Sequence, residues 1–116
     1  MSPLKLAKIY MDIVFGNGDI EELLMILSDN FTFEGPLYKF DTPQGYVQSL
    51  QLDPPKDFKY KIIKAFEDES SACLIYQFSK QNLNLPMAQL FEIEGNKIKQ
   101  ITLIFDASAF KSVGKN

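Results

Sequence analysis

The sequence predicts an α+β protein in which helices cover one face of an antiparallel sheet. Two observations lead to this prediction. Apolar residues recur at helical spacing in the first half of the chain, whereas they alternate with polar residues over four long segments of the second half. The connections between those four segments are short, which favours antiparallel neighbours. Helices gathered on one face of such a sheet define the α+β class.

Three helices are expected before the long strands. The first has an apolar stripe formed by Leu6, Ile9, Tyr10, Ile13 and Val14. The Gly-Asn-Gly segment at 16–18 ends it with residues that tolerate left-handed backbone. A second helix is expected from Asp19, an N-cap residue followed three positions later by Glu22, as in a capping box. A third, short helix opens at the Asp-Thr-Pro segment 41–43 and ends at the Asp-Pro-Pro segment 53–55.

One short and four long strands are expected. The short strand covers 31–34 and follows a turn at 28–30. The long strands are expected at 58–67, 71–79, 85–94 and 97–106. Gly95-Asn96 is typical of a two-residue hairpin turn. No repeat or linker divides the chain, so we expect one domain over 1–116 with a flexible tail at 111–116.

The composition excludes several classes of function. Net charge is −3 and no basic stripe exists, which argues against a nucleic-acid partner. The chain has no histidine, and all 12 basic residues are lysines. A Ser-His-Asp system, a zinc site with imidazole ligands and a bidentate arginine clamp are therefore excluded. No carboxylates have metal-ligand spacing, and we expect neither a metal nor a cofactor.

The sequence also indicates a cytoplasmic protein. The N-terminal residues lack the apolar run of a signal peptide. No segment approaches the roughly 18 apolar residues of a membrane span, so no membrane partner is expected. The one cysteine, Cys73, cannot form an internal disulfide, and its apolar neighbours favour a small buried residue.

Two groups of motifs carry a family resemblance. The opening group is AKIY at 7–10, GDI at 18–20 and LSDNFTFEGP at 27–36. The closing group is FEIEGNKI at 91–98 and IFD at 104–106. Their order and spacing resemble NTF2-like, SnoaL-like domains over roughly residues 4–110. The resemblance implies a cone, in which a curved antiparallel sheet wraps around about three N-terminal helices and encloses an apolar pocket. The reaction stays open, because this fold hosts isomerases, dehydratases, cyclases, epoxide hydrolases and non-catalytic binding modules.

The catalytic residues of those enzymes are matched only in part. Tyr10 corresponds to the first-helix tyrosine of the ketosteroid isomerases, but the position of their base, just before Pro36, is Gly35. Their protonated aspartate corresponds to Gln89, whose amide can still donate a hydrogen bond. The polyketide cyclases need a histidine and the epoxide hydrolases an arginine, and the chain has neither.

Three side chains are the candidate catalytic residues. The resemblance makes Asp106 a pocket-facing base, whereas its place before the turn 107–110 makes it an equally good cap. Tyr10 is either a core tyrosine or a donor into the pocket. Gln89 lies among apolar neighbours and needs a partner. We predict that Asp106, Tyr10 and Gln89 line one cavity, where burial without a cation raises the pKa of Asp106. Its apolar wall is predicted to be Phe33, Met87, Phe91 and Ile104.

These residues leave three functions open. The first is a pocket that binds a small hydrophobic molecule. The second is a cofactor-independent isomerase, lyase or cyclase-type enzyme that uses Asp106 with Tyr10 and Gln89. The third is a dimeric protein-interaction module. A homodimer is predicted because the sheet face away from the helices is too apolar for water. That face is expected to carry Ile63, Ala65, Leu90, Ile101 and Leu103, with Cys73 and Ile75 or their alternating neighbours.

Overall fold

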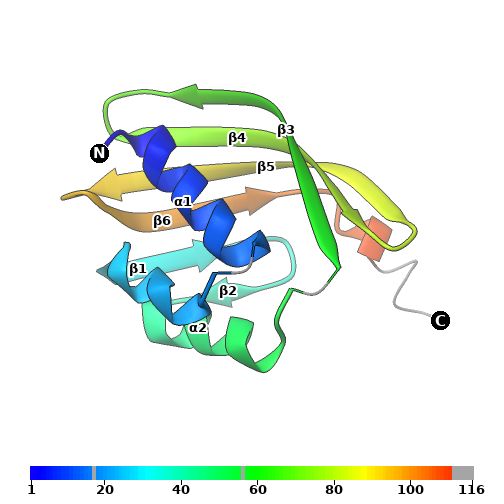
Figure 1. Cartoon of the computed structure of the whole chain (residues 1–116), viewed down its shortest axis with the longest axis horizontal. Helices are drawn as coiled ribbons and strands as arrows, with labels where there is room; N and C mark the ends of the chain where they lie inside the picture. Colours follow the sequence, from blue (N-terminus) through cyan, green and yellow to red (C-terminus); the bar gives the residue numbers. More distant parts are fainter. Residues whose placement is uncertain (17, 56, 111–116) are drawn as a thin grey trace.

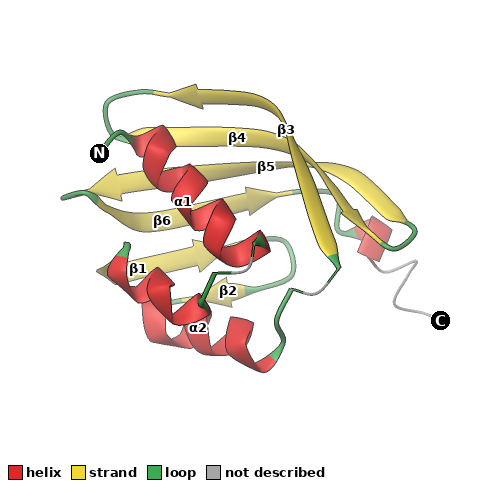
Figure 2. Ribbon diagram, viewed as in Figure 1, coloured by secondary structure: helices red, strands yellow, loops and turns green. Residues whose placement is uncertain are grey.

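A computed structural model describes residues 1–16, 18–55 and 57–110 of the chain. Its helices lie against one face of a curved sheet, as predicted (Figures 1 and 2). The predicted tail at 111–116 lies outside the described residues. In chain order the elements are α1 (Pro3–Phe15), the 3₁₀ helix η1 (Ile20–Met25), β1 (Leu27–Glu34), β2 (Lys39–Phe40), α2 (Pro43–Leu52), β3 (Phe58–Glu67), β4 (Ser71–Lys80), β5 (Leu83–Glu94) and β6 (Lys97–Ile104).

The sheet has six strands in the order β2-β1-β6-β5-β4-β3. Strands β3 to β6 form the predicted antiparallel meander. Strand β1, however, pairs parallel with β6, and β2 pairs antiparallel with β1. The sheet is therefore mixed and not antiparallel throughout. Sequence patterns missed this because parallel partners come from distant parts of the chain and share no hairpin.

The sequence signals at the ends of the elements act largely as expected. Ser2 Oγ accepts the N–H of Lys5 at 3.2 Å and caps α1, whose Pro3 occupies the first turn. Thr42 Oγ1 accepts the N–H of Gly45 at 3.0 Å and caps α2. Gly95 and Asn96 have φ angles of 59° and 62°, the left-handed values that a two-residue hairpin turn requires.

Two local predictions are corrected. The second helix is a short 3₁₀ helix, although Asp19 caps it as expected by accepting the N–H of Glu21 at 3.0 Å. The predicted turn at 28–30 lies inside β1. The register of the β1–β6 pairing shifts between Leu27 and Thr32, so the turn-forming residues 28–30 lie in an irregularity of the strand, where Ser28 Oγ accepts the N–H of Asn30 at 3.4 Å.

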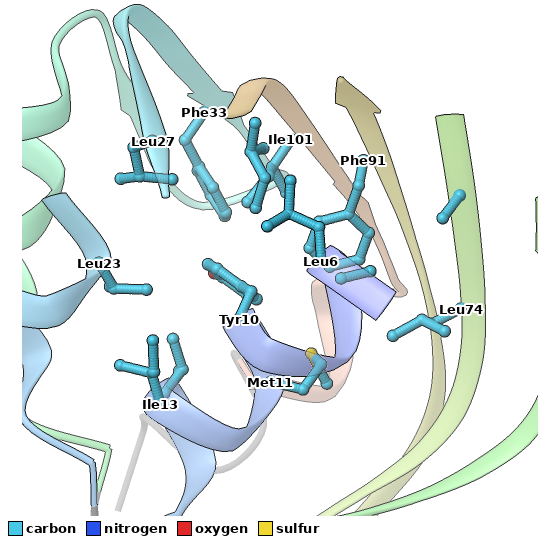
Figure 3. Close-up of a cluster of buried hydrophobic side chains, with 14 of the residues drawn as sticks. Leu6, Tyr10, Met11, Ile13, Leu23, Leu27, Phe33, Leu74, Phe91 and Ile101 are labelled. Carbon is cyan, nitrogen blue, oxygen red and sulfur yellow. The ribbon is translucent and has the colours of Figure 1, made fainter. Parts of the chain in front are cut away.

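The core lies between α1 and the inner face of the sheet. The predicted stripe of α1 is buried except for Ile9, which is half-buried. Figure 3 shows Tyr10 of α1 among the side chains of Leu23, Phe33 and Phe91. Phe91 is fully buried, and its ring meets that of Tyr10 edge-on at 5.2 Å between centroids. No helix among the described residues is long and apolar enough to cross a bilayer.

The outer face of the sheet differs from the predicted one. Cys73, Ile75 and Leu90 lie on it, half-buried, with Ile63 exposed. Phe66, which pairs with Cys73, is 52% exposed, and Ile104, which pairs with Ala88, is 60% exposed. The predicted members Ala65, Ile101 and Leu103 pack against the core instead.

Strand register explains why these residues lie on the face of the sheet opposite to the predicted one. A bulge between Ile62 and Lys64 reverses the alternation in β3, so that Ala65 faces inward and Phe66 outward. In β6 the register sets Leu103 opposite the inward-facing Gln89. Because side chains alternate along a strand, a shift of one residue exchanges the two faces.

Candidate functional site

A cavity of about 560 Å³ opens between α1, α2, the β1–β2 connection and the inner face of the sheet. A cavity of this size accommodates an ordinary small molecule. Its wall is mostly aromatic. The aromatic lining residues are Tyr10, Phe15, Phe33, Tyr38, Phe40, Tyr46, Phe58, Tyr76, Phe78, Phe105 and Phe110.

Four polar side chains meet at the buried part of this wall. The Tyr76 hydroxyl donates to Gln89 Oε1 at 2.8 Å. The hydroxyls of Tyr10 and Tyr46 are hydrogen-bonded to each other, although α1 and α2 are far apart in sequence. All four side chains line the same cavity, so the two pairs lie in one wall. We call Tyr10, Tyr46, Tyr76 and Gln89 the tyrosine–glutamine cluster.

The cluster is neutral at physiological pH. Burial is the main reason that the pKa of each of its three tyrosines lies above the ordinary value, because the phenolate loses its hydration. The mutual proximity of the phenols raises these pKa values further. The cluster therefore offers hydroxyl and amide groups and no charge to anything that enters the cavity.

Charged groups are scarce around the cavity. Of the described residues that line it, only Asp53 and Lys80 carry a charge. Lys80 belongs to the last position of β4, and its Nζ lies 4.7 Å from the centre of the Phe58 ring. The described residues contain no group of three carboxylates or thiols able to hold a metal ion. The site thus resembles a neutral binding pocket more than an acid–base centre.

Only some of the predicted pocket residues line the cavity in the structure. Tyr10, Gln89, Phe33 and Met87 all line the cavity. Phe91 does not reach it, since it lies buried behind the Tyr10 ring. Asp106 and Ile104 are both exposed and are not part of the lining. The prediction that Asp106 and Ile104 share a cavity with Tyr10 and Gln89 is wrong.

Asp106 instead holds the turn that follows β6. Its Oδ1 accepts the hydroxyl of Ser108 at 2.6 Å and the N–H of Ser108 at 3.0 Å. These hydrogen bonds hold the pKa of Asp106 below its ordinary value, the opposite of the predicted rise. The cause is again the register of β6: Leu103 opposes Gln89 on the inner face, so Ile104 lies on the outer face.

Sequence reasoning missed half of the cluster. Tyr46 lies in the helix predicted between 41–43 and 53–55, and Tyr76 lies in the strand predicted at 71–79, but neither tyrosine is among the predicted site residues. Both are buried tyrosines, and a buried phenol almost always has a hydrogen-bond partner. Tyr76 also alternates in step with Leu74 and Phe78. That pattern indicates a buried hydroxyl, which needs a polar partner on the same face of the sheet.

Solved structures share this architecture. No protein-family model matches the sequence, and no curated protein sequence does either. An NTF2-like protein of unknown function from Cytophaga hutchinsonii is 22% identical, with a TM-score of 0.79 over 96% of both chains. An LEH-like epoxide hydrolase from M. tuberculosis is 15% identical, with a TM-score of 0.77 over 97% of this chain and 90% of the other.

A third similar structure contains a small ligand. It is a protein with a ketosteroid isomerase-like fold from Catenulispora acidiphila, in complex with trimethylamine, and it is 13% identical. Its TM-score is 0.72 over 94% of this chain and 90% of the other. The helix order, the curved sheet and these similarities agree with the resemblance seen in the sequence: the chain has the fold of the NTF2-like proteins.

Proposed function

We propose that this protein binds a small, uncharged, largely apolar molecule in the cavity between its helices and sheet. The observation that carries the proposal is the lining itself, an aromatic wall around a buried neutral cluster of hydroxyl and amide groups. Apolar contact supplies most of the affinity of such pockets, and a few polar groups orient the ligand. A cytoplasmic location is part of this proposal.

A binding role fits the lining better than carboxylate-based catalysis. A general base must lie within hydrogen-bond reach of the proton it removes. Asp106, the predicted base, lies outside the lining and is engaged by Ser108. Tyr10 and Gln89 remain as donors toward a ligand, which is a positioning role. The absence of a carboxylate from the cluster therefore favours binding over the isomerase or lyase alternative.

Filling the cavity is expected to abolish binding. In Met87→Trp the larger side chain occupies ligand space, so we expect the affinity for N-phenyl-1-naphthylamine, an uncharged fluorescent dye, to fall at least about 10-fold. Fluorescence titration measures this, and circular dichroism checks the fold because overpacking also destabilises. The matched control is Ala88→Trp, one position further along β5 and on the outer face.

Two results decide the binding proposal. Asp106→Asn and Ala88→Trp are expected to bind the dye as the parent protein does. Equal dye affinity in Met87→Trp and the parent would place the dye elsewhere and refute the proposed site. No dye binding by the parent protein would also count against the proposal.

We also propose that the protein forms a homodimer through the outer face of its sheet. Phe66 and Ile104 are large apolar side chains exposed at this face, with Ile75 and Leu90 between their strands. Such an apolar area is unusual on a sheet left in water. The third function predicted from the sequence, a dimeric protein-interaction module, corresponds to this homodimer, in which the partner is a second copy of the chain.

The charges on the outer face favour one orientation of the dimer. The edge strand β3 carries exposed lysines at 59, 61 and 64. Toward the opposite edge of the sheet, β1 carries the exposed Glu34, next to Thr102 of β6. A two-fold axis along the strands brings β3 of one copy toward the side of its partner that carries Glu34, whereas an axis across the strands opposes lysine to lysine.

A charge in the centre of this face is expected to separate the copies. We expect Ile104→Lys to weaken self-association by at least about 10-fold, because the lysine ammonium would have to be buried in the interface in place of an apolar side chain. Sedimentation velocity at micromolar concentration measures this. Met25→Lys is the control, since Met25 is exposed on η1 away from the sheet face. A monomeric parent protein at that concentration contradicts the proposal.

A further inference from the structure

The chain forms one short helical turn at 107–110 after its last strand, which Figure 1 shows in orange-red beyond the end of β6. The N–H of Ala109 donates to the carbonyl of Asp106 at 3.3 Å, and the N–H of Phe110 donates to the carbonyl of Ala107 at 3.1 Å. Both hydrogen bonds join residues of the turn to one another. They hold its shape without connecting it to a strand of the sheet.

The side chain of Asp106 closes the start of this turn. Its Oδ1 accepts the hydroxyl of Ser108 at 2.6 Å and the N–H of Ser108 at 3.0 Å. Asp106 and Ser108 are exposed, whereas Ala109 and Phe110 are half-buried and pack against the core. One side of the turn therefore lies in water and the other against the protein. We call residues 106–110 the C-terminal turn.

Phe110 brings the C-terminal turn into the wall of the cavity. Its ring centroid lies 5.0 Å from that of Phe105 and 6.1 Å from that of Phe78. All three side chains line the cavity. Phe78 belongs to β4, and Phe105 packs against the core. Phe110 thus completes an aromatic part of the wall from a segment that lies beyond the sheet.

This part of the wall is attached more weakly than the rest. Most of the other aromatic lining residues belong to α1, α2 and the strands β1 to β4. Displacing one of them breaks backbone hydrogen bonds of its helix or strand. Displacing Phe110 costs its two ring contacts and the packing of Ala109, and single ring contacts are individually modest. Segments with few buried contacts are the ones that open most readily.

We propose that the C-terminal turn is a flap that controls entry into the cavity, with Phe110 as the side chain that closes it. The inference rests on the proposed binding function. Opening moves the ring of Phe110 away from Phe78 and Phe105, and closing places one more aromatic face over a bound molecule. Asp106, which the sequence predicted to be a base inside the cavity, is a positioning residue that keeps the flap formed without touching the ligand.

The rate constants of dye binding test the flap. In Phe110→Ala we expect the association rate constant of N-phenyl-1-naphthylamine to rise about 5- to 10-fold, because entry no longer requires the ring to leave its two contacts. Dissociation is expected to accelerate by at least the same factor. Stopped-flow fluorescence measures both rate constants, and circular dichroism checks the fold.

The matched control is Phe40→Ala. It removes the same ring from another lining residue, which lies on β2 and is held by the pairing of that strand with β1. Loss of an ordinary wall contact accelerates dissociation and leaves association nearly unchanged. Faster association is therefore expected in Phe110→Ala and not in Phe40→Ala.

Two variants of Asp106 test its positioning role. Asp106→Ala removes the acceptor of both Ser108 hydrogen bonds and is expected to raise the association rate constant about 3- to 10-fold. Asp106→Asn keeps an oxygen acceptor, and asparagine caps a helix about as well as aspartate, so its rate constants are expected to equal those of the parent protein. An effect of the lost charge alone would appear equally in both variants and would overturn this role.

A measurement on the parent protein does not depend on any variant. The amide hydrogens of Ala109 and Phe110 are expected to exchange with water at least about 3-fold more slowly when the dye is bound, because a bound molecule favours the closed flap. Nuclear magnetic resonance measures this exchange. Exchange that the dye leaves unchanged, or parent-like association in Phe110→Ala, overturns the flap and leaves the binding function intact. If the parent protein does not bind the dye, the proposed function itself fails.

Discussion

Raising the pH from 9 to 11 is expected to lower the free energy of unfolding by about 4 kcal/mol. Tyr10, Tyr46 and Tyr76 are buried, and the pKa of each lies above the ordinary value of 10.0, chiefly because burial strips water from the phenolate. In the unfolded chain the same groups ionise near pH 10. Between pH 10 and the folded-state pKa the unfolded chain therefore binds fewer protons than the folded protein.

The sign of this dependence follows from the proton count. Stability falls with rising pH wherever the unfolded state binds fewer protons, by about 1.4 kcal/mol per pH unit for each tyrosine. The contribution is fully present below pH 10 and is lost as the pH approaches the folded-state pKa.

Urea unfolding followed by circular dichroism at intervals from pH 8 to 11.5 measures this loss. Tyr76→Phe removes one of the three buried phenols and is expected to reduce the fall between pH 9 and 11 by about 1.4 kcal/mol. That variant also leaves Gln89 Oε1 without its donor, so its stability at pH 8 is lower from the start. Tyr38→Phe, an exposed tyrosine, is the control. A stability that stays flat to pH 11 contradicts the burial of the cluster.

Phe91→Ala is expected to destabilise the protein by about 3–5 kcal/mol. The Phe91 side chain is fully buried, and its partners across the sheet are Ala72 and Ile101, both buried as well. Removing the ring leaves a cavity that the surrounding sheet cannot close, because neighbouring strands are fixed by hydrogen bonds. Domains of this size have a total stability of only about 6–17 kcal/mol.

The consequence for the site makes this variant informative. Phe91 lies behind Tyr10 and outside the cavity, so its loss frees the Tyr10 ring without changing the lining. Urea unfolding at pH 7 measures the loss of stability, and Met25→Ala, an exposed apolar residue, is expected to change it by less than about 0.5 kcal/mol. A small effect of Phe91→Ala would show that the core around α1 is loosely packed.

The elements that the sequence predicted correctly are those whose signal lies within a short stretch of the chain. The stripe of α1, the caps at Ser2 and Thr42 and the turn at Gly95-Asn96 each depend on residues within one or two turns of chain. The apolar alternation of β4 depends only on which residues can be buried. Such signals are read directly because helix and strand periods are properties of the backbone.

The sequence was less informative about pairings between distant segments. The parallel pairing of β1 with β6 and the bulge after Ile62 depend on which strands meet. Both change side-chain direction without altering the local pattern. Asp106 and Ile104 were placed in the pocket because their alternation was assigned to the wrong face, and a shift of one residue exchanges faces completely.

The composition of the tyrosine–glutamine cluster also depends on which distant segments of the chain meet. Tyr10 and Gln89 were found from the sequence because a family resemblance indicated them. Tyr46 and Tyr76 join them only because α2 and β4 bring their hydroxyls to α1 and β5. The sequence by itself determined that the protein has an apolar interior with a few buried phenols and an amide. Only the tertiary structure decided which of these groups share hydrogens, because a hydrogen bond requires an approach of about 3 Å that no spacing along the chain specifies.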